Sequence, residues 1–285
     1  MKSLNKIRQP AVAGLFYPAS KNKLEAEIKT LLSISDSRKT FNNIFGIIVP
    51  HAGYIYSGST ASYGFNLLKN KNIETVIIIS PSHREYFPGI SVYEGDGYET
   101  PLGVVEVNKD MTDKLAEESK IIFKGSEGHR SEHAVEVQIP FLQVLLKDFK
   151  IVPIVMGDQG DLFVDELAEK LSLAVDNKTI VIASSDLSHY YSGDAADKLD
   201  SIVEKRILDF DYEMLQKDFQ FRNCEACGGG TIVSIMKAAS KLNKKKSEVL
   251  YRCNSGDTTG DYREVVGYLS AVIYGDPILI RSEAS

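Results

Sequence analysis

The sequence predicts a single α/β domain with a central, mostly parallel sheet flanked by helices. Short runs rich in β-branched residues alternate with longer amphipathic stretches along the whole chain. Residues 76–79 and 179–183 are apolar on both faces, as in strands that helices cover on each side. No repeat and no linker rich in Pro, Gly or Ser divides the chain, so one domain over residues 1–285 is expected.

The expected strands are the short apolar runs that are rich in Val and Ile. In chain order they cover residues 45–49, 75–80, 104–107, 151–156, 179–183, 248–252 and 265–273. For the last two an antiparallel arrangement is possible. The others follow the alternation with helices that is typical of a parallel sheet.

The expected helices are the amphipathic stretches between these runs. In chain order they cover residues 23–32, 59–68, 111–118, 134–146, 165–175, 195–208 and 230–242. Apolar residues recur at the helical period in residues 134–146. Pro140 is expected to kink this helix unless it lies in the first turn.

Composition excludes several classes of protein. The chain has 285 residues with 43% hydrophobic and 25% charged residues, which is ordinary for a globular protein, and its net charge of −6 argues against a nucleic-acid surface. The basic residues within 241–246 are interpreted as a solvated helix end. No apolar run approaches the roughly 20 residues that span a bilayer, and the N-terminus lacks the apolar core of a signal peptide. We expect a cytoplasmic protein that binds neither nucleic acid nor membrane.

Histidines follow several of the expected strands directly. His51 follows residues 45–49, His83 follows 75–80, and Asp186 and His189 follow 179–183. In an open parallel sheet, ligands bind beyond the carboxyl ends of the strands. Imidazole is both the commonest metal ligand and the commonest acid or base at neutral pH. The sequence therefore predicts a functional site on one rim of the sheet.

Two further histidines, His129 and His133, are spaced so that both would share one face of a helix. Gly128 and Ser131 favour another interpretation, in which Ser131 is the N-cap and His129 lies in the preceding loop. His133 would then project from a helix start, where it could touch substrate or orient a partner. His129 is interpreted as incidental to the site.

Cys224 and Cys227 form a C-x-x-C motif, which is typical of a redox pair or of half a zinc site. A second ligand pair at zinc spacing is absent from the sequence. Cys227 also precedes a predicted helix, whose N-terminus favours a thiolate, and glycines 228–230 would let backbone approach a ligand or cradle an anion. The alternative is a buried, inert cysteine beside a glycine-rich turn.

Several segments together resemble the Memo family, and they span nearly the whole chain. They are "AGLFYPAS" (13–20), "VPHAGYIYSG" (49–58), "SPSH" (80–83), "TPLG" (100–103), "EHAVEVQIPFLQ" (132–143), "IVPIVMG" (151–157), "SSDLSHY" (184–190), "ACGGGTIV" (226–233) and "VVGYLSAV" (265–272). The resemblance implies a fold similar to class III extradiol dioxygenases, which hold non-haem Fe(II) with two histidines and a carboxylate.

By the same resemblance, His51, His83 and Cys227 match the metal-binding positions of the family. The cysteine replaces the carboxylate of the dioxygenases. Two histidines with a thiolate suit reduced copper, iron or zinc, and we expect one ion, Fe(II) or copper rather than zinc.

The resemblance also implies roles around the metal. His189 matches the acid/base histidine, and Asp186 matches the aspartate of the family motif and would assist it. Independently of the resemblance, we expect Tyr54, His133 and Gly228 to contact substrate. We expect a metal-dependent oxidoreductase acting on a small molecule with O₂. The alternatives are a non-catalytic module that binds a peptide or other ligand in the cleft, and a hydrolase that uses a metal-bound water. The oligomeric state is not readable from the sequence.

Overall fold

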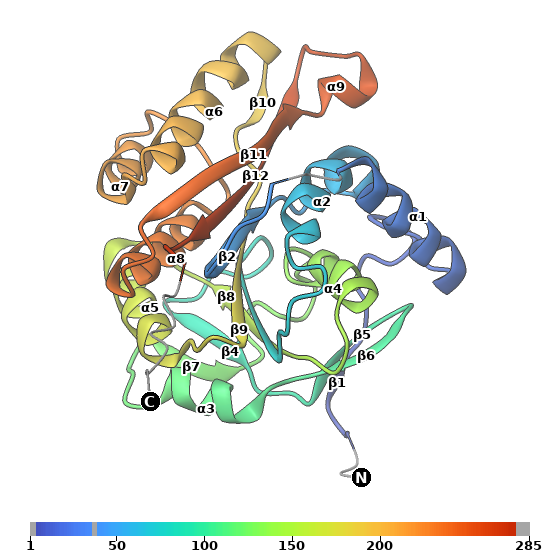
Figure 1. Cartoon of the computed structure of the whole chain (residues 1–285), viewed down its shortest axis with the longest axis vertical. Helices are drawn as coiled ribbons and strands as arrows, with labels where there is room; N and C mark the ends of the chain where they lie inside the picture. The colour runs from blue at the N-terminus through green and yellow to red at the C-terminus, as the bar shows by residue number, and fades with distance from the viewer. Residues whose placement is uncertain (1–3, 36–38, 278–285) are drawn as a thin grey trace, which may run out of the picture.

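The core of the fold is a nine-stranded mixed sheet (Figure 1), seen in a computed structural model that describes residues 4–35 and 39–277. The two ends of the predicted domain 1–285 lie outside the described residues. In spatial order the strands are β10 (His189–Tyr191), β12 (Val265–Tyr274), β2 (Ile44–Val49), β9 (Thr179–Ser184), β3 (Thr75–Pro81), β8 (Lys150–Met156), β4 (Ile90–Tyr93) and β7 (Ile122–Gly125), and β11 (Lys246–Asn254) pairs with β12.

The centre of the sheet is parallel. Strands β2, β9, β3 and β8 all run in one direction, whereas β12 and β4 are antiparallel to their central neighbours. Ile78 of β3 lies opposite Pro153 on one side and Ile182 on the other. Helices cover both faces of these strands, and this explains why their sequences are apolar at successive positions.

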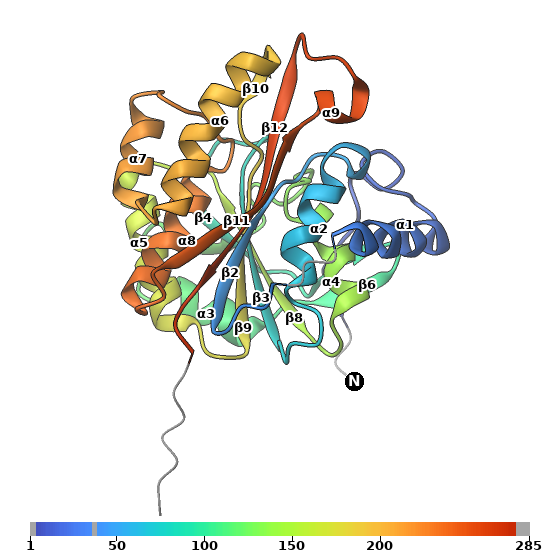
Figure 2. The ribbon, with the colours of Figure 1, turned by 45° about the horizontal axis from the view of Figure 1, so that its top comes forward.

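Helices form a layer on each face of the sheet (Figure 2). One layer comprises α1 (Lys21–Ile34), α2 (Ser59–Asn66) and α4 (Ile139–Leu145). The opposite layer comprises α3 (Lys109–Ala116), α5 (Asp161–Ala174), α6 (Gly193–Leu208), α7 (Tyr212–Gln220) and α8 (Gly229–Lys241). Alternate residues of β3 pack into the two apolar clusters between sheet and helices, Ile77 and Ile79 into one and Val76 and Ile78 into the other.

A second, three-stranded sheet lies beside the main one. Its strands are β1 (Ile7–Arg8), β5 (Gly97–Thr100) and β6 (Gly103–Glu106), in which β1 pairs in parallel with β5. The remaining elements are a π-helical turn, η1 (Tyr54–Gly58), a 3-10 turn, η2 (Glu136–Gln138), and the short helix α9 (Gly256–Thr259). Among the residues that the structure describes, no helix combines the length and apolar character needed to cross a membrane.

The predicted α/β fold is confirmed, and every expected strand and helix overlaps an observed one. The last two strands, β11 and β12, are indeed antiparallel. The expected helix over residues 134–146 is wrong in its first part, because α4 begins only at Ile139 and Pro140 lies in its first turn. Ser131 is therefore not a helix N-cap. Not predicted were β1, β4, β5, β7, β10, α7, α9 and the turn η1.

Candidate metal centre

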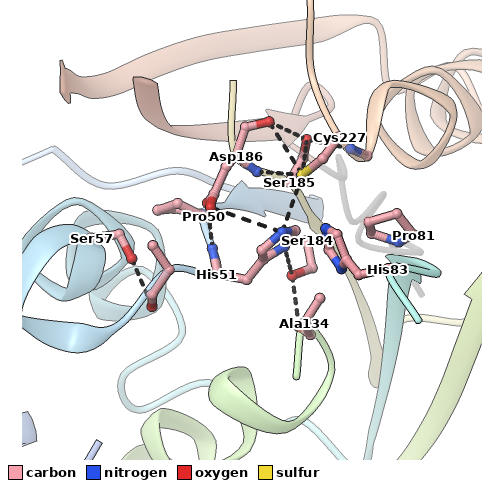
Figure 3. A network of polar contacts seen from close by, with 12 residues as sticks. Pro50, His51, Ser57, Pro81, His83, Ala134, Ser184, Ser185, Asp186 and Cys227 are labelled. Carbon is pink, nitrogen blue, oxygen red and sulfur yellow. Dashed lines mark hydrogen bonds and ion pairs between the residues drawn. The ribbon is translucent and has the colours of Figure 1, made fainter. Parts of the chain in front are cut away.

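The carboxyl ends of β2, β3 and β9 meet at one edge of the sheet, as predicted. His51 follows β2, His83 follows β3, and Cys227 lies just before α8 (Figure 3). One side-chain ligand atom from each of these three residues falls within 4.8 Å of the other two. The donor set, two imidazoles and a sulfur, suits iron, copper or zinc.

His51 is held so that its Nε2 atom faces the sulfur. Its Nδ1 lies 2.9 Å from the hydroxyl oxygen of Ser184. That hydroxyl donates its only hydrogen to the carbonyl of Ala134 (2.7 Å) and accepts a hydrogen bond from Nε2 of Gln138 (2.8 Å). The His51 Nδ1 must therefore be the donor, which leaves the lone pair on Nε2 directed into the site.

His83 is oriented by a carboxylate. Its Nδ1 lies 2.9 Å from Glu132 Oε1, and its backbone N–H donates to Oε2 at 2.6 Å. Burial alone would raise the pKa of Glu132, but the hydrogen bonds from His83 outweigh it and lower the pKa to about 2. An ionised Glu132 accepts the Nδ1 hydrogen, so His83 also keeps its Nε2 lone pair free for a ligand role.

A second group, formed by His83, Glu132 and His133, also brings three ligand atoms within 4.8 Å of one another. Its carboxylate is already engaged, because Glu132 Oε1 also accepts from the backbone N–H groups of His133 and Ala134, both at 2.9 Å. Glu132 therefore acts as an anchor for His83. The group of His51, His83 and Cys227 is the better candidate for a metal.

Cys227 contacts His51 through its sulfur, at 3.1 Å from Nε2, and accepts a hydrogen bond from the Asp186 N–H at 3.3 Å. Burial and the Asp186 carboxylate raise the pKa of its thiol. The prediction that the helix start stabilises a thiolate here is therefore wrong for the protein without a cation, because desolvation outweighs the backbone N–H groups. A metal ion would supply the positive charge that a deprotonated sulfur needs at this position.

Two histidines that face the site, His51 and His133, have lowered pKa values and are neutral at neutral pH. Burial, followed by the nearby His83, lowers the pKa of His51 well below its ordinary value. Burial and the nearby His51 lower the pKa of His133 to about 4. Since only an unprotonated ring nitrogen can bind a metal, this environment favours a ligand role over a charged one.

Asp186 bonds to His51 rather than to His189. Its Oδ1 accepts from the backbone N–H of His51 at 2.7 Å, and its Oδ2 lies 4.0 Å from His51 Nε2. Burial raises the pKa of Asp186. Within the described chain it makes no hydrogen bond to the ring of His189, which lies on β10 and borders the same cavity.

A cavity of about 720 Å³ opens against the metal group. Its wall includes His51, His83, His133, Asp186 and His189, so most of the predicted site residues do converge. The ring of His133 stacks on that of His83, with the ring centroids 4.8 Å apart. Further wall residues are Phe16, Tyr56, Tyr190 and Tyr268.

Two predicted substrate contacts are wrong. Tyr54 is 3% exposed and its hydroxyl donates to the Val137 carbonyl at 2.7 Å, because the π-helical turn directs it into the core. Gly228 does not border the cavity either. A Cβ atom there would lie 2.6 Å from the Ser184 carbonyl oxygen, so this glycine allows the start of α8 to pack against the end of β9.

His129 and Cys224 lie outside the site. The His129 ring is buried and bonds to the Tyr98 hydroxyl at 2.7 Å and to the Ser91 carbonyl at 3.1 Å. Cys224 is buried in the apolar core, where burial raises the pKa of its thiol to about 12. The C-x-x-C motif thus places one cysteine in the core and the other at the metal group.

Sequence reasoning missed the residues that orient the ligands, namely Glu132, Gln138 and Ser184. Each is buried. A signal was present for two of them, because Glu132 and Gln138 lie within or beside an otherwise apolar stretch, and a buried polar side chain requires a partner. Ser184 gave no such signal.

This chain is similar to known proteins over most of its length. A family model described as Memo-like protein matches residues 8–272. A MEMO1 family protein of Thermoplasma volcanium is 41% identical over 267 residues, which cover 93% of this chain and 98% of that protein. A MEMO1 family protein of Nitrosopumilus maritimus is 37% identical over 268 residues, which cover 92% and 98%.

Among solved structures, the uncharacterized protein JW3007 from Escherichia coli K12 matches with a TM-score of 0.56 and 14% sequence identity. The match covers 81% of this chain and 99% of that chain. At this level of identity the likeness concerns the fold alone.

Proposed function

The chain belongs to the Memo-like family, and on that premise we propose that it is a metal-dependent oxidoreductase. In this proposal His51, His83 and Cys227 hold one Fe(II) or copper ion, and the reaction uses O₂ on a small molecule in the adjoining cavity. The observation that carries the proposal is the convergence of three ligand atoms within 4.8 Å, from elements far apart in the chain.

The donor set supports a redox metal. Two imidazoles with one thiolate form the set that holds copper in many electron-transfer proteins, and imidazole also suits iron. An ion held by so few protein ligands would offer one-electron chemistry and open positions for small molecules. The cavity wall beside the metal group is where such molecules would enter.

The chain's own residues would prepare the site for this chemistry. Glu132 and Ser184 fix the ring orientation and the tautomer of His83 and His51. His189 borders the cavity without a hydrogen bond to Asp186, so its imidazole is available to accept a proton from a bound molecule and return it. The aromatic wall residues would reduce the access of water.

Metal binding to purified protein tests the ligand assignment. We expect one equivalent of Fe(II) or Cu(I) to remain bound after anaerobic equilibrium dialysis, and the His51→Ala and Cys227→Ala variants to retain far less. Cys253→Ala is the matched control, because that cysteine contacts Thr60 and takes no part in the metal group. Equal metal content in wild type and both site variants would contradict the assignment.

Oxygen uptake by the metal-loaded protein tests the redox part separately. We expect consumption that requires both the metal and the reductant or substrate supplied, and that His189→Ala slows without removing the metal. Stoichiometric metal with no oxygen consumption under any supplied electron donor would refute the oxidoreductase and leave a metalloprotein.

One observation favours a second candidate, a ligand-binding module without turnover. Leu15, Ile55 and Tyr190 border the cavity and are 80%, 71% and 74% exposed, respectively. Exposed apolar side chains around a cavity are typical of a surface that binds a ligand or peptide. This candidate predicts ligand binding that persists in the His189→Ala variant, with no oxygen consumption.

A further inference from the structure

Tyr268 of β12 is a buried tyrosine whose hydroxyl has no hydrogen-bond partner among the residues that the structure describes. The residue is 2% exposed and borders the cavity together with Asp186 and His189. The described chain forms no hydrogen bond to its hydroxyl, whose surroundings include the Asp186 carboxylate. The buried Tyr54 and Tyr98 differ, since their hydroxyls bond to the Val137 carbonyl and to His129, each at 2.7 Å.

The Tyr268 hydroxyl also differs from the polar atoms that are simply enclosed. Four hydroxyls in the described chain are fully enclosed without a partner, those of Ser91, Thr112, Ser188 and Ser270. Tyr268 is not one of them, and it borders open space. The hydroxyl is therefore open to the cavity, and a molecule bound there could accept a hydrogen bond from it.

The hydroxyl would act as a donor. Burial and the negative charge of Asp186 raise the pKa of Tyr268, so the phenol keeps its hydrogen at any physiological pH. A phenol in this state offers one O–H group to an acceptor. An oxygen on the ligand that accepts a hydrogen bond would be a suitable partner for it.

The rest of the wall limits the ligand further. Phe16, Tyr56 and Tyr190 supply aromatic surface, which favours an aromatic ring. Among the described wall residues there is no lysine or arginine, whereas Asp261 and Glu264 are acidic. Without a metal ion on the neighbouring metal group, an anionic group would find no cation in this wall, so an uncharged ligand fits the metal-free cavity better.

We propose that Tyr268 recognises an uncharged aromatic ligand by donating its hydroxyl hydrogen to an oxygen of that ligand, beside Asp186 and His189. Only the position of this ligand next to a metal rests on the proposed function. The hydrogen bond itself requires the cavity and Tyr268, and it can therefore be measured with and without metal.

Three probes of nearly equal shape test the proposal: acetophenone, α-methylstyrene and benzoate. The second replaces the carbonyl oxygen by a methylene group, and the third replaces the methyl group by a charged oxygen. We expect the wild type to bind acetophenone more tightly than either analogue. Tyr268→Phe should weaken acetophenone by roughly three- to tenfold, the usual effect of one hydrogen bond, and leave α-methylstyrene unchanged.

Tyr251→Phe is the control, because Tyr251 lies on β11, is 40% exposed and does not border this cavity. It should change neither affinity. Tyr268→Phe should also unfold at the same temperature as the wild type or higher, since no protein hydrogen bond is lost. A lower melting temperature would show that the hydroxyl has a structural partner.

Several outcomes would overturn the proposal. These are equal weakening of acetophenone and α-methylstyrene by Tyr268→Phe, benzoate binding to the metal-free protein at least as tightly as acetophenone, or no measurable binding of acetophenone to the wild type. Metal dialysis on the same samples separates this result from the proposed function. A protein that binds no metal but shows the Tyr268 effect would refute the metal assignment alone.

Discussion

The buried residue His129 is kept neutral by its surroundings. His129 has both ring nitrogens hydrogen-bonded, and burial, which outweighs the nearby Glu132 carboxylate, lowers its pKa to about 3. An unfolded chain would restore an ordinary pKa of about 6.5. Because the folded state resists a proton that the unfolded state accepts, acid must favour unfolding through this residue.

This difference predicts how stability depends on pH. The contribution of His129 is complete above pH 6.5 and is lost as the pH falls from there toward about 3, at up to about 1.4 kcal/mol per pH unit. The free energy of unfolding of His129→Gln should depend less steeply on pH, because the proton that the unfolded chain binds at His129 is no longer available. Urea unfolding of both proteins at about pH 7, 6 and 5 measures the two slopes. Equal pH dependence in the wild type and in His129→Gln would show that His129 is protonated to the same extent in the folded and unfolded chains.

For single residues, the sequence predicts the metal ligands much better than it predicts the residues that orient those ligands. His51 and His83 are predictable because each directly follows a buried parallel strand, and Cys227 because it precedes a helix. Ser184 and Gln138 orient His51 only through a chain of hydrogen bonds that the tertiary fold creates. The spacing of these residues in the sequence does not indicate this chain of hydrogen bonds.

Among the elements, strand β1 is only two residues long, yet it is tied to the segment that carries Glu132 and His133. Arg8 forms an ion pair with Glu136, in which both side chains are at most 4% exposed. Its guanidinium also donates to the carbonyls of His129, at 3.1 Å, and of Glu132. The N-terminal strand therefore fixes the backbone that presents Glu132 to His83.

Removing this cation should destabilise the protein strongly. Arg8→Met leaves the Glu136 carboxylate buried without a counter-charge, and breaking such a pair costs roughly 3–5 kcal/mol. The free energy of unfolding from urea titration measures the loss. Lys6→Met is the control, because the Lys6–Glu94 pair on the neighbouring surface is exposed and should change stability little. Equal effects of the two substitutions would contradict the argument.

The elements that were predicted differ physically from those that were not. Buried parallel strands such as β3 and β9 have no polar face, so their sequences show it directly. Strands β1 and β10 are two and three residues long, and only their pairing with distant partners makes them strands. The segment before α4 is not α-helical, and its side chains bond to distant parts of the chain: Glu132 to His83, and Glu136 to Arg8 of the N-terminal strand.

Across the whole molecule, the candidate metal centre joins parts of the chain that are remote in sequence. His51 and Cys227 lie 176 residues apart, yet their side chains meet at 3.1 Å. His83 comes from a third element, β3, and Glu132 from a loop tied to the N-terminus. A metal at this point would connect the ends of two central strands to the helix layer on one face, and it would bind the folded chain far better than the unfolded one.

Metal binding should therefore stabilise the whole fold. A ligand at about a thousandfold excess over its dissociation constant raises the free energy of unfolding by about 4 kcal/mol, provided that it does not bind the unfolded chain. We expect Cu(I) or Fe(II) to raise the melting temperature of the wild type anaerobically, a chelator to reverse this, and Mg²⁺ to have no effect. His51→Ala should abolish the increase because it removes a ligand, and Cys253→Ala should retain it. An equal increase in His51→Ala would mean that the metal binds elsewhere, since stabilisation at this centre requires all three of its protein ligands.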